Sequence, residues 1–251
     1  MKVLENISAM RRMVSASRIF NPQEHLAGKR IAVVGPADSA FEKPMGDYIN
    51  GFDYVIRINK APHSLSESKM PFIGNRTDVL FHSFFENNET GGGPIDFDLY
   101  KEQGVKFLIN PNNCVFGLRA HLAYFKRNSY EDPTFLLPWN FYHQLRKNFG
   151  EYVPTVGYSA LYTALHSGAK EVYITGFTFF KTPYMSDYRD HLKDVDTNQK
   201  HIKDHGMHNP DLELSEFIKN YMPHQSFVKL DDALKDIVKT HYGSRSAIAA
   251  E

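Results

Sequence analysis

Short apolar runs alternate with amphipathic stretches along most of this chain. Runs rich in Val, Ile, Tyr and Phe, bounded by Gly, Pro, Asn or charged residues, predict buried strands. They occupy residues 30–34, 54–58, 78–81, 105–109, 171–175 and, more weakly, 226–230. Helical spacing predicts helices at residues 118–127, 141–149, 159–167, 212–221 and 231–240. This alternation indicates an α/β fold, with a mainly parallel sheet and helices on both faces.

Two long stretches between the predicted elements lack a clear period. Residues 84–97 contain a run of glycines, and residues 179–207 are rich in Asp, His, Lys and Tyr. Loops of this length inside a compact domain are usually functional or mobile. Since no repeat or low-complexity linker divides the chain, we expect one domain at residues 29–242, with 179–207 as a substrate lid and 243–251 as a tail.

Residues 1–28 are predicted to form a helical segment ahead of this domain. Apolar residues recur there at helical spacing among three arginines: Val3, Leu4, Ile7, Met10, Met13 and Val14, with Arg11, Arg12 and Arg18. One interpretation is a helix packed on the domain, and the other is an interfacial helix on an anionic membrane. With no secretory signal and no long apolar run, we expect a cytoplasmic protein, the alternative being peripheral attachment to the inner face of the membrane.

Charge and cysteine content exclude several classes of function. The 251 residues include 29 Lys and Arg and 29 Asp and Glu, so no global field recruits nucleic acid. Cys114 is the only cysteine. An intramolecular disulfide and a metal site of several thiolates are therefore excluded, and Cys114 itself is best interpreted as a small buried hydrophobe.

Two separated segments each place glycines or small polar residues beside a predicted strand, where an open α/β sheet holds phosphates and sugars. These positions are Gly35, Ser39 and Asn59 in the first segment, and Thr155, Val156, Gly157, Gly176 and Phe177 in the second. Gly35 alone would fit an ordinary strand-ending turn. Neither GxGxxG nor GxxxxGK[ST] is present, so a dinucleotide-dependent oxidoreductase and a P-loop NTPase are disfavoured.

Taken in order, these residues resemble the sialylmotifs of the eukaryotic-type sialyltransferases, glycosyltransferase family 29. His208, followed by Glu213, matches the very small motif. The large motif is similar to residues 33–35, 53–62 and 74–77, and the small motif to residues 154–157 through 165, 170–172 and 176–177. The small-motif region is also similar to bacterial sialyltransferases that act on lipooligosaccharide. The family implies a single-domain Rossmann-like fold that transfers a nonulosonic acid from a CMP donor to a glycan acceptor.

The resemblance also implies a role for individual residues. His208 would be the general base, and Asn59 would meet the ribose or phosphate of the donor. Thr155, Val156 and Gly157 would cradle the nucleotide. Gly176 and Phe177 would lie near the cytosine.

The chain departs from the family pattern at several places. Pro36 stands where the family usually has Asn, so Ser39 or Asp38 would take over that contact, and Val156 stands where the small motif usually has Thr. The eukaryotic cysteine pair is missing, which fits a bacterial or viral cytosolic enzyme. No His-Tyr-x-Glu motif precedes His208. The role of phosphate partner is therefore left open among Tyr184, Tyr188, His191 and His205.

The expected chemistry asks for a base and for charge neutralisation on the departing phosphate. A histidine suits the first task because its ordinary pKa is about 6.5. We expect inversion at the anomeric carbon, with the CMP-sugar as substrate and no separate cofactor. Asp194-Val195-Asp196 is a DxD triplet, but such pairs arise easily by chance, so we predict no metal. Glu213 is expected to fix the local loop or cap its helix.

Two rival functions remain open. A Kdo transferase of the same fold would use CMP-Kdo, another CMP-linked 2-keto sugar acid. The residues that separate the two donors are expected in the lid and in 110–113, where Asn110 is a further candidate for binding the nucleotide sugar. A nucleotide-binding module without catalysis is the second alternative, because Pro36 and Val156 alter the motifs.

Overall fold

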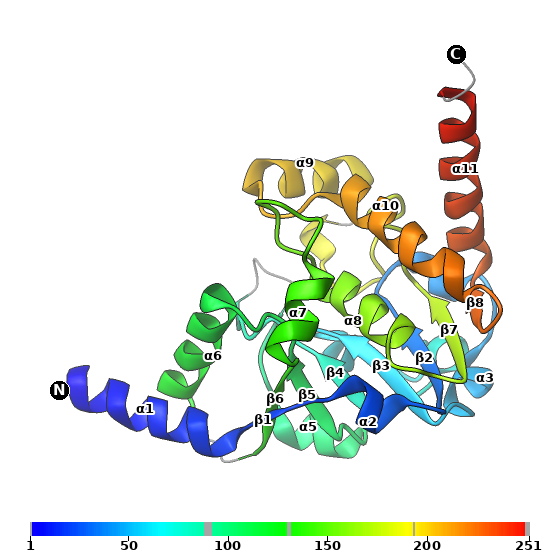
Figure 1. Cartoon of the computed structure of the whole chain (residues 1–251). Coiled ribbons are helices and arrows are strands. Elements are labelled where there is room, and N and C mark those ends of the chain that lie inside the picture. Colours follow the sequence, from blue (N-terminus) through cyan, green and yellow to red (C-terminus); the bar gives the residue numbers. More distant parts are fainter. Residues whose placement is uncertain (1, 88–91, 130–131, 193, 249–251) are drawn as a thin grey trace.

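One parallel sheet forms the centre of the computed structural model, which describes residues 2–87, 92–129, 132–192 and 194–248 (Figure 1). In chain order its strands are β1 (Ser17–Ile19), β2 (Arg30–Val34), β3 (Tyr54–Ile58), β4 (Val79–Phe81), β5 (Phe107–Asn110), β6 (Thr134–Leu136), β7 (Glu171–Thr175) and β8 (Val228–Leu230). Their order in space is β1-β6-β5-β4-β3-β2-β7-β8. Every neighbouring pair in this sheet is parallel. The predicted fold class is confirmed.

Helices cover both faces of the sheet (Figure 1). They are α1 (Lys2–Ala16), α2 (Pro22–Leu26), α3 (Gly46–Asn50), α4 (Met70–Ile73), α5 (Phe97–Glu102), α6 (Val115–Arg127), α7 (Trp139–Leu145), α8 (Val156–Leu165), α9 (Val195–His205), α10 (Pro210–Tyr221) and α11 (Asp232–Ile248). One core cluster joins the sheet to α2, α7, α8, α10 and α11. Two further clusters join its other face to α1, α5 and α6 and to α3 and α4.

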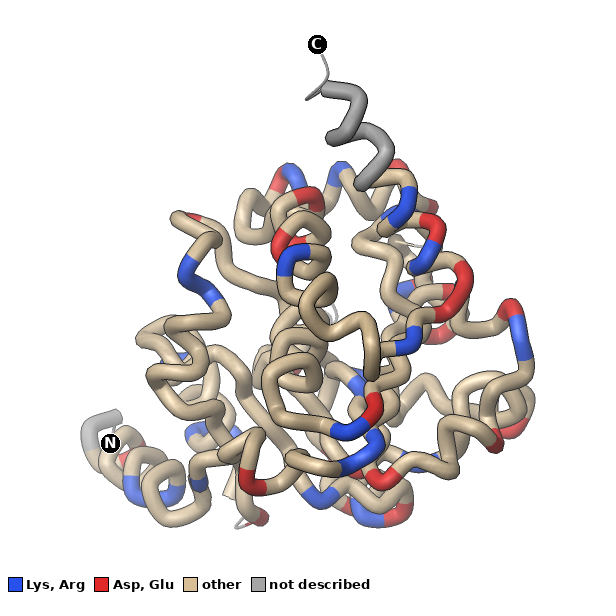
Figure 2. The backbone as a smooth tube through the Cα atoms, turned by 45° about the vertical axis from the view of Figure 1, so that its right-hand side comes forward, with Lys and Arg blue, Asp and Glu red and all other residues tan. Residues whose placement is uncertain are grey.

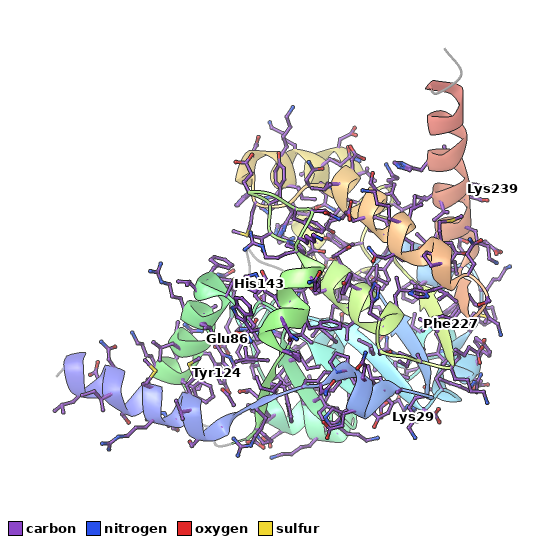
Figure 3. The ribbon with its side chains drawn as sticks, in the orientation of Figure 1. Lys29, Glu86, Tyr124, His143, Phe227 and Lys239 are labelled. Atoms are coloured by element: carbon purple, nitrogen blue, oxygen red, sulfur yellow. The ribbon has the colours of Figure 1, made fainter. Side chains whose placement is uncertain are left out.

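The central strands are largely apolar, as is typical of a parallel sheet covered on both faces. Ile31 and Val33 of β2 point into the cluster under α8, whereas Ala32 and Val34 point into the cluster under α3 and α4. The helices on each face contribute buried side chains to these clusters. Tyr124 of α6, for example, is buried in the cluster of the opposite face (Figure 3).

Charged residues lie mainly around the periphery of the molecule. Figure 2 shows basic and acidic residues interspersed there, in keeping with the balanced composition. No helix in the described parts of the chain combines the length and the apolar character needed to cross a membrane.

The predicted and observed elements agree best in the middle of the sheet. β2, β3 and β7 have the predicted bounds, whereas β1 and β6, of three residues each, were not predicted. Residues 179–207, expected to be a long lid loop, contain the helix α9, which was not predicted. In the predicted loop 84–97, residues 88–91 lie outside the described residues. α11 continues to Ile248, into the stretch expected as a tail, of which 249–251 lie outside the described residues.

The N-terminal segment is joined to the far edge of the sheet. β1 pairs with β6 in parallel, with Arg18 opposite Phe135. α1 packs on α6, where Ala9 and Ala16 are buried, and Arg12 Nη2 donates a hydrogen bond of 2.7 Å to the Phe125 carbonyl. The buried side of α1 therefore packs on the domain, as the first of the two interpretations expected.

The direction of the chain through the sheet reverses beside β2. From β2 the chain builds β3, β4, β5 and β6 on one side, and later adds β7 and β8 on the other. In open α/β sheets, ligands bind outside the carboxyl ends of the strands at such a reversal. The topology therefore points to the ends of β2 and β7.

Candidate active site

A cavity of about 410 Å³ opens at the carboxyl ends of β2, β3 and β7. Its walls come from the turns after these strands, the N-terminus of α8, and the segment between β7 and α10. Most of the predicted site residues line it: Asn59, Thr155, Val156, Gly157, Gly176, Phe177, Tyr184, Tyr188, His205 and His208. The fold thus brings together residues that are up to about 150 positions apart in the chain.

Two glycines let the ends of β2 and β7 approach each other. A Cβ atom added to Gly35 would lie 2.2 Å from the Gly176 carbonyl oxygen, and Gly176 has a φ of 72°. The Gly176 N–H donates to Asp231 Oδ2 at 2.8 Å, and Thr175 Oγ1 donates to the same oxygen at 3.0 Å. Only glycine fits this close, left-handed turn, which the Asp231 carboxylate fixes from behind.

Thr155 begins α8 and is fixed by a buried glutamate. Its Oγ1 accepts the Tyr158 N–H at 3.0 Å, which is an N-cap bond. Its N–H and Oγ1–H donate to Glu213 Oε1 and Oε2, at 2.6 and 2.9 Å. Burial raises the Glu213 pKa to about 8. Glu213 therefore fixes the loop before α8, which is distant in sequence, rather than the loop or helix start beside it.

His208 is oriented by one backbone carbonyl. Its Nδ1 lies 2.6 Å from the Val153 oxygen. A carbonyl can only accept, so the ring proton resides on Nδ1 and the lone pair on Nε2. Burial, which disfavours the charged form, lowers the His208 pKa, and the Arg189 charge lowers it further. His208 is therefore prepared as a neutral base.

Asn59 directly follows β3 and lies in the left-handed region, with a φ of 51°. Asparagine tolerates this conformation better than other residues with a Cβ atom. Its backbone N–H donates to the Phe81 carbonyl at 2.7 Å, and its Oδ1 accepts the Ser83 N–H at 3.1 Å. These bonds fix the amide on the wall of the cavity that Tyr188 also lines.

Tyr184 and Tyr188 line the lid side of the cavity, with ring centroids 5.3 Å apart. Burial raises the pKa of both hydroxyls, so both are neutral donors near pH 7. The strand-like bridge between Tyr184 and Ala37 joins the lid to the turn after β2. Lys69 connects the lid to the rest of the domain a second time. Its buried Nζ donates to the Ser186 carbonyl at 2.8 Å and forms an ion pair with Asp187 at 2.9 Å.

The sequence profile of glycosyltransferase family 29, the sialyltransferases, matches residues 1–222. The chain belongs to this family. A mammalian sialyltransferase structure has a TM-score of 0.55 at 17% identity, covering 90% of this chain and 78% of its own. Cst-I, a monofunctional α-2,3-sialyltransferase from Campylobacter jejuni, has a TM-score of 0.51 at 15% identity, covering 85% and 80%. Such identities show a shared fold alone. Among curated proteins, none matches the chain.

Three candidates do not line the cavity of this family 29 glycosyltransferase. Gly35 lies behind its wall, where it supports the Gly176 turn. Ser39 faces a separate cavity of about 420 Å³. Asn110 is fully buried and locally bonded, since its Nδ2 donates to the Gly117 carbonyl at 3.1 Å and its Oδ1 accepts the Asn112 N–H at 3.0 Å. Asn110 thus positions Asn112, which does line the cavity.

Of the four candidates for the phosphate partner, not all line the cavity. The sequence analysis also missed one residue that does. His191 does not line the cavity, whereas Tyr184, Tyr188 and His205 do. Arg189, which the sequence analysis passed over, lines it with only 8% of its surface exposed. A single arginine in a charged stretch gives no sequence signal. Its position becomes informative only once the sialyltransferase fold buries it.

The DxD triplet of this sialyltransferase lies at a helix start. Asp194 caps α9, accepting the Thr197 N–H at 2.8 Å. Among the described side chains, no group of three or more His, Cys, Asp or Glu residues is arranged to hold a metal ion. Cys114 is half-buried, with its Sγ 3.6 Å from the Tyr142 hydroxyl.

Proposed function

We propose that this family 29 glycosyltransferase moves a sialic acid from its CMP donor to a hydroxyl of a glycan acceptor, with inversion. The observation that supports it most directly is the His208 geometry. The bond from Nδ1 to the Val153 carbonyl leaves Nε2 as an acceptor on a residue that lines the cavity. A neutral imidazole at this place can take the proton of the acceptor hydroxyl as its oxygen attacks the anomeric carbon.

The wall opposite the lid suits a nucleotide monophosphate. The first N–H groups of a helix have no intrahelical acceptor and carry a partial positive charge. Val156 and Gly157 supply such groups at the start of α8, beside the Gly176 turn. The tyrosine hydroxyls of the lid can donate to the phosphate as negative charge develops on it. CMP is thus bound by backbone on one side and by side chains on the other.

The donor sugar is tested by turnover. Release of CMP from CMP-Neu5Ac and from CMP-Kdo is followed with and without a panel of glycan acceptors. We expect transfer from CMP-Neu5Ac. Turnover of CMP-Kdo alone would replace the sialic acid by Kdo, and binding of CMP without turnover of either donor would indicate a non-catalytic module. Activity in excess chelator tests the proposal that neither metal nor cofactor takes part.

The role of His208 is tested by His208→Gln, which can still accept one hydrogen bond but cannot take up a proton. We expect kcat to fall by about 10²–10⁴-fold, the range typical of a lost general base. CMP affinity measured by calorimetry should stay unchanged. His143→Gln, on α7 and outside the cavity (Figure 3), is the matched control. Equal losses in both variants would remove His208 from the mechanism.

We further propose that α1 rests on an anionic bilayer. Its side away from α6 exposes Leu4, Ile7, Met10 and Val14, and two of the four are 72% exposed. Arg11 on α1 and Arg18 just beyond it are also exposed, so apolar and basic groups share this surface. An apolar face with flanking arginines is typical of a helix that binds anionic lipid interfaces.

This contact is tested by sedimentation with lipid vesicles. The protein should pellet with vesicles that contain phosphatidylglycerol and stay in solution with pure phosphatidylcholine. Leu4→Asp with Val14→Asp should abolish pelleting, whereas Asn6→Asp on the same helix should lower it only slightly. A chain that stays in solution with both vesicles, or that forms a dimer through this face by light scattering, would contradict the proposal.

A further inference from the structure

Arg189 has a particular position among the charged residues of the cavity. It is the one Lys or Arg among the described residues that line the cavity. The acid that lines it, Glu213, is turned to Thr155. The proposed donor carries two anionic groups, the phosphodiester and the sugar carboxylate. Moving an anion out of water into such a cavity requires a compensating cation or several donors.

The guanidinium of Arg189 lies near His201, the lid tyrosine Tyr184 and His208. Its Nη2 lies 3.3 Å from His201 Nε2. A guanidinium can only donate, so His201 Nε2 accepts and the imidazole is neutral. Burial raises the pKa of Tyr184 and the Arg189 charge opposes that rise, while burial and then the same charge lower the pKa of His208. Arg189 therefore lies near both a phosphate candidate and the base, on the wall of the same cavity.

We propose that Arg189 binds the phosphate of the CMP donor, and that His201 positions its guanidinium. This inference rests on the proposed function and adds the residue that compensates the leaving-group charge. A guanidinium matches two phosphate oxygens with a planar pair of N–H groups. His201 fixes that plane from one side as an acceptor, and Tyr184 shares the same phosphate region.

The charges in the transfer step agree with this arrangement. The bond from the anomeric carbon to the phosphate oxygen breaks, and its electron pair stays on CMP, which gains one negative charge. The acceptor oxygen forms the new bond to the same carbon, and its proton passes to Nε2 of His208. Negative charge thus grows near Arg189 while positive charge grows at His208. An interaction that strengthens in the transition state raises kcat as well as affinity.

Calorimetry with CMP and with cytidine tests the assignment, since the two ligands differ only in the phosphate. In Arg189→Gln, CMP affinity should fall by about tenfold or more, as for one lost hydrogen bond to a charged group, with cytidine affinity unchanged. Arg189→Lys should recover part of the loss. Arg146→Gln, at a half-buried arginine that caps the C-terminus of α7 outside the cavity, is the matched control and should bind both ligands normally.

Each other outcome has a definite meaning. Equal losses for CMP and cytidine would show a structural role and overturn the proposal. Normal CMP binding with a raised KM for the donor would assign Arg189 to the carboxylate, and would overturn it too. If the unaltered protein binds no CMP at all, the proposed function fails instead, so the two failures are distinguishable.

The positioning role of His201 is tested by a quantity that loss of packing alone would not change, the ratio of CMP affinity to cytidine affinity. His201→Gln keeps an acceptor in place of Nε2, whereas His201→Leu removes it at similar volume. We expect the ratio of CMP to cytidine affinity to be kept in the first variant and lowered severalfold in the second, with equal melting temperatures. The same ratio in both variants would remove His201 from the proposal.

Discussion

The two sides of the cavity are built in different ways. We call one side the nucleotide wall, formed by Thr155, Val156, Gly157, Gly176 and Phe177, with Gly35 packed behind it. The other side is formed by the lid, residues 179–207, with its tyrosines, histidines and arginine, and by His208 just after it. Acidic side chains fix the backbone of the wall, where the half-buried Asp231 bonds to Gly176 and the buried Glu213 to Thr155. The lid is held by the Lys69 side chain and by the backbone bridge between Tyr184 and Ala37.

This difference suggests that the wall binds the nucleotide, whereas the lid takes part in the transfer step. The wall offers N–H groups and a close glycine turn, which suit a ligand part that stays the same during the reaction. The lid offers groups that gain or lose charge, and these must adjust as the phosphate leaves. Changes in the wall should therefore affect nucleotide binding and folding together, whereas changes in the lid should affect turnover while the fold persists.

The largest effect is expected at the glycine contact of the wall. Gly35→Ala forces a Cβ atom to within 2.2 Å of a backbone oxygen that cannot move aside easily. We expect CMP affinity to fall at least about tenfold, and the free energy of unfolding by about 1–3 kcal/mol. Calorimetry and urea unfolding measure the two.

Gly104→Ala is the control for that substitution. The added carbon meets nothing within 4 Å there, but φ is 81°, so only backbone strain is introduced. It should lose stability and keep CMP affinity. If Gly35→Ala binds CMP as well as Gly104→Ala does, the wall does not depend on this contact.

Sequence patterns revealed the wall better than the lid, for physical reasons. The strands that lead to the wall are largely apolar on both faces, so β2, β3 and β7 were predicted with their bounds. α9 is polar around most of its surface and resembles a charged loop. Asn110 looked like a ligand residue, but its amide is satisfied locally. Arg189 was missed because its burial depends on tertiary packing, which no local pattern encodes.

Glu213 should make stability depend on pH. Its folded pKa of about 8 lies above the ordinary value of about 4.3, so the folded chain holds the extra proton between these pH values. The free energy of unfolding should therefore fall as pH rises through this window, by up to about 1.4 kcal/mol per unit. Urea unfolding across it should show that slope, and Glu213→Gln should reduce it. Glu216→Gln, one turn along α10, should keep it.

Lys69 connects the lid to the body of the molecule, so its loss should loosen the lid alone. Lys69→Met removes the donors to the Ser64 and Ser186 carbonyls and the ion pair with Asp187. We expect the KM for the donor to rise about tenfold, the effect of losing one charged interaction. CMP contacts with the wall should persist. A fall in stability as large as that of Gly35→Ala would show that lid and wall are one unit.

The smallest effect is expected at the DxD triplet. Asp194→Ala removes the cap of α9, which should lower the free energy of unfolding by about 1 kcal/mol. Turnover should stay near normal, with or without chelator. Activity that is lost in this variant, and that manganese restores in the unaltered protein after chelation, would show a metal site that the lid geometry does not indicate.

The short pairing of β1 with β6 has a consequence for expressing the protein. Residues 17–19 cover the outer side of β6, the last strand that the rest of the chain supplies on that edge. A chain shortened to begin at residue 29 would retain every residue of the cavity, yet it would present the unpaired N–H and C=O groups of β6 to solvent. Such edges pair with other chains. The first twenty residues thus protect the enzyme from self-association at a site remote from its chemistry.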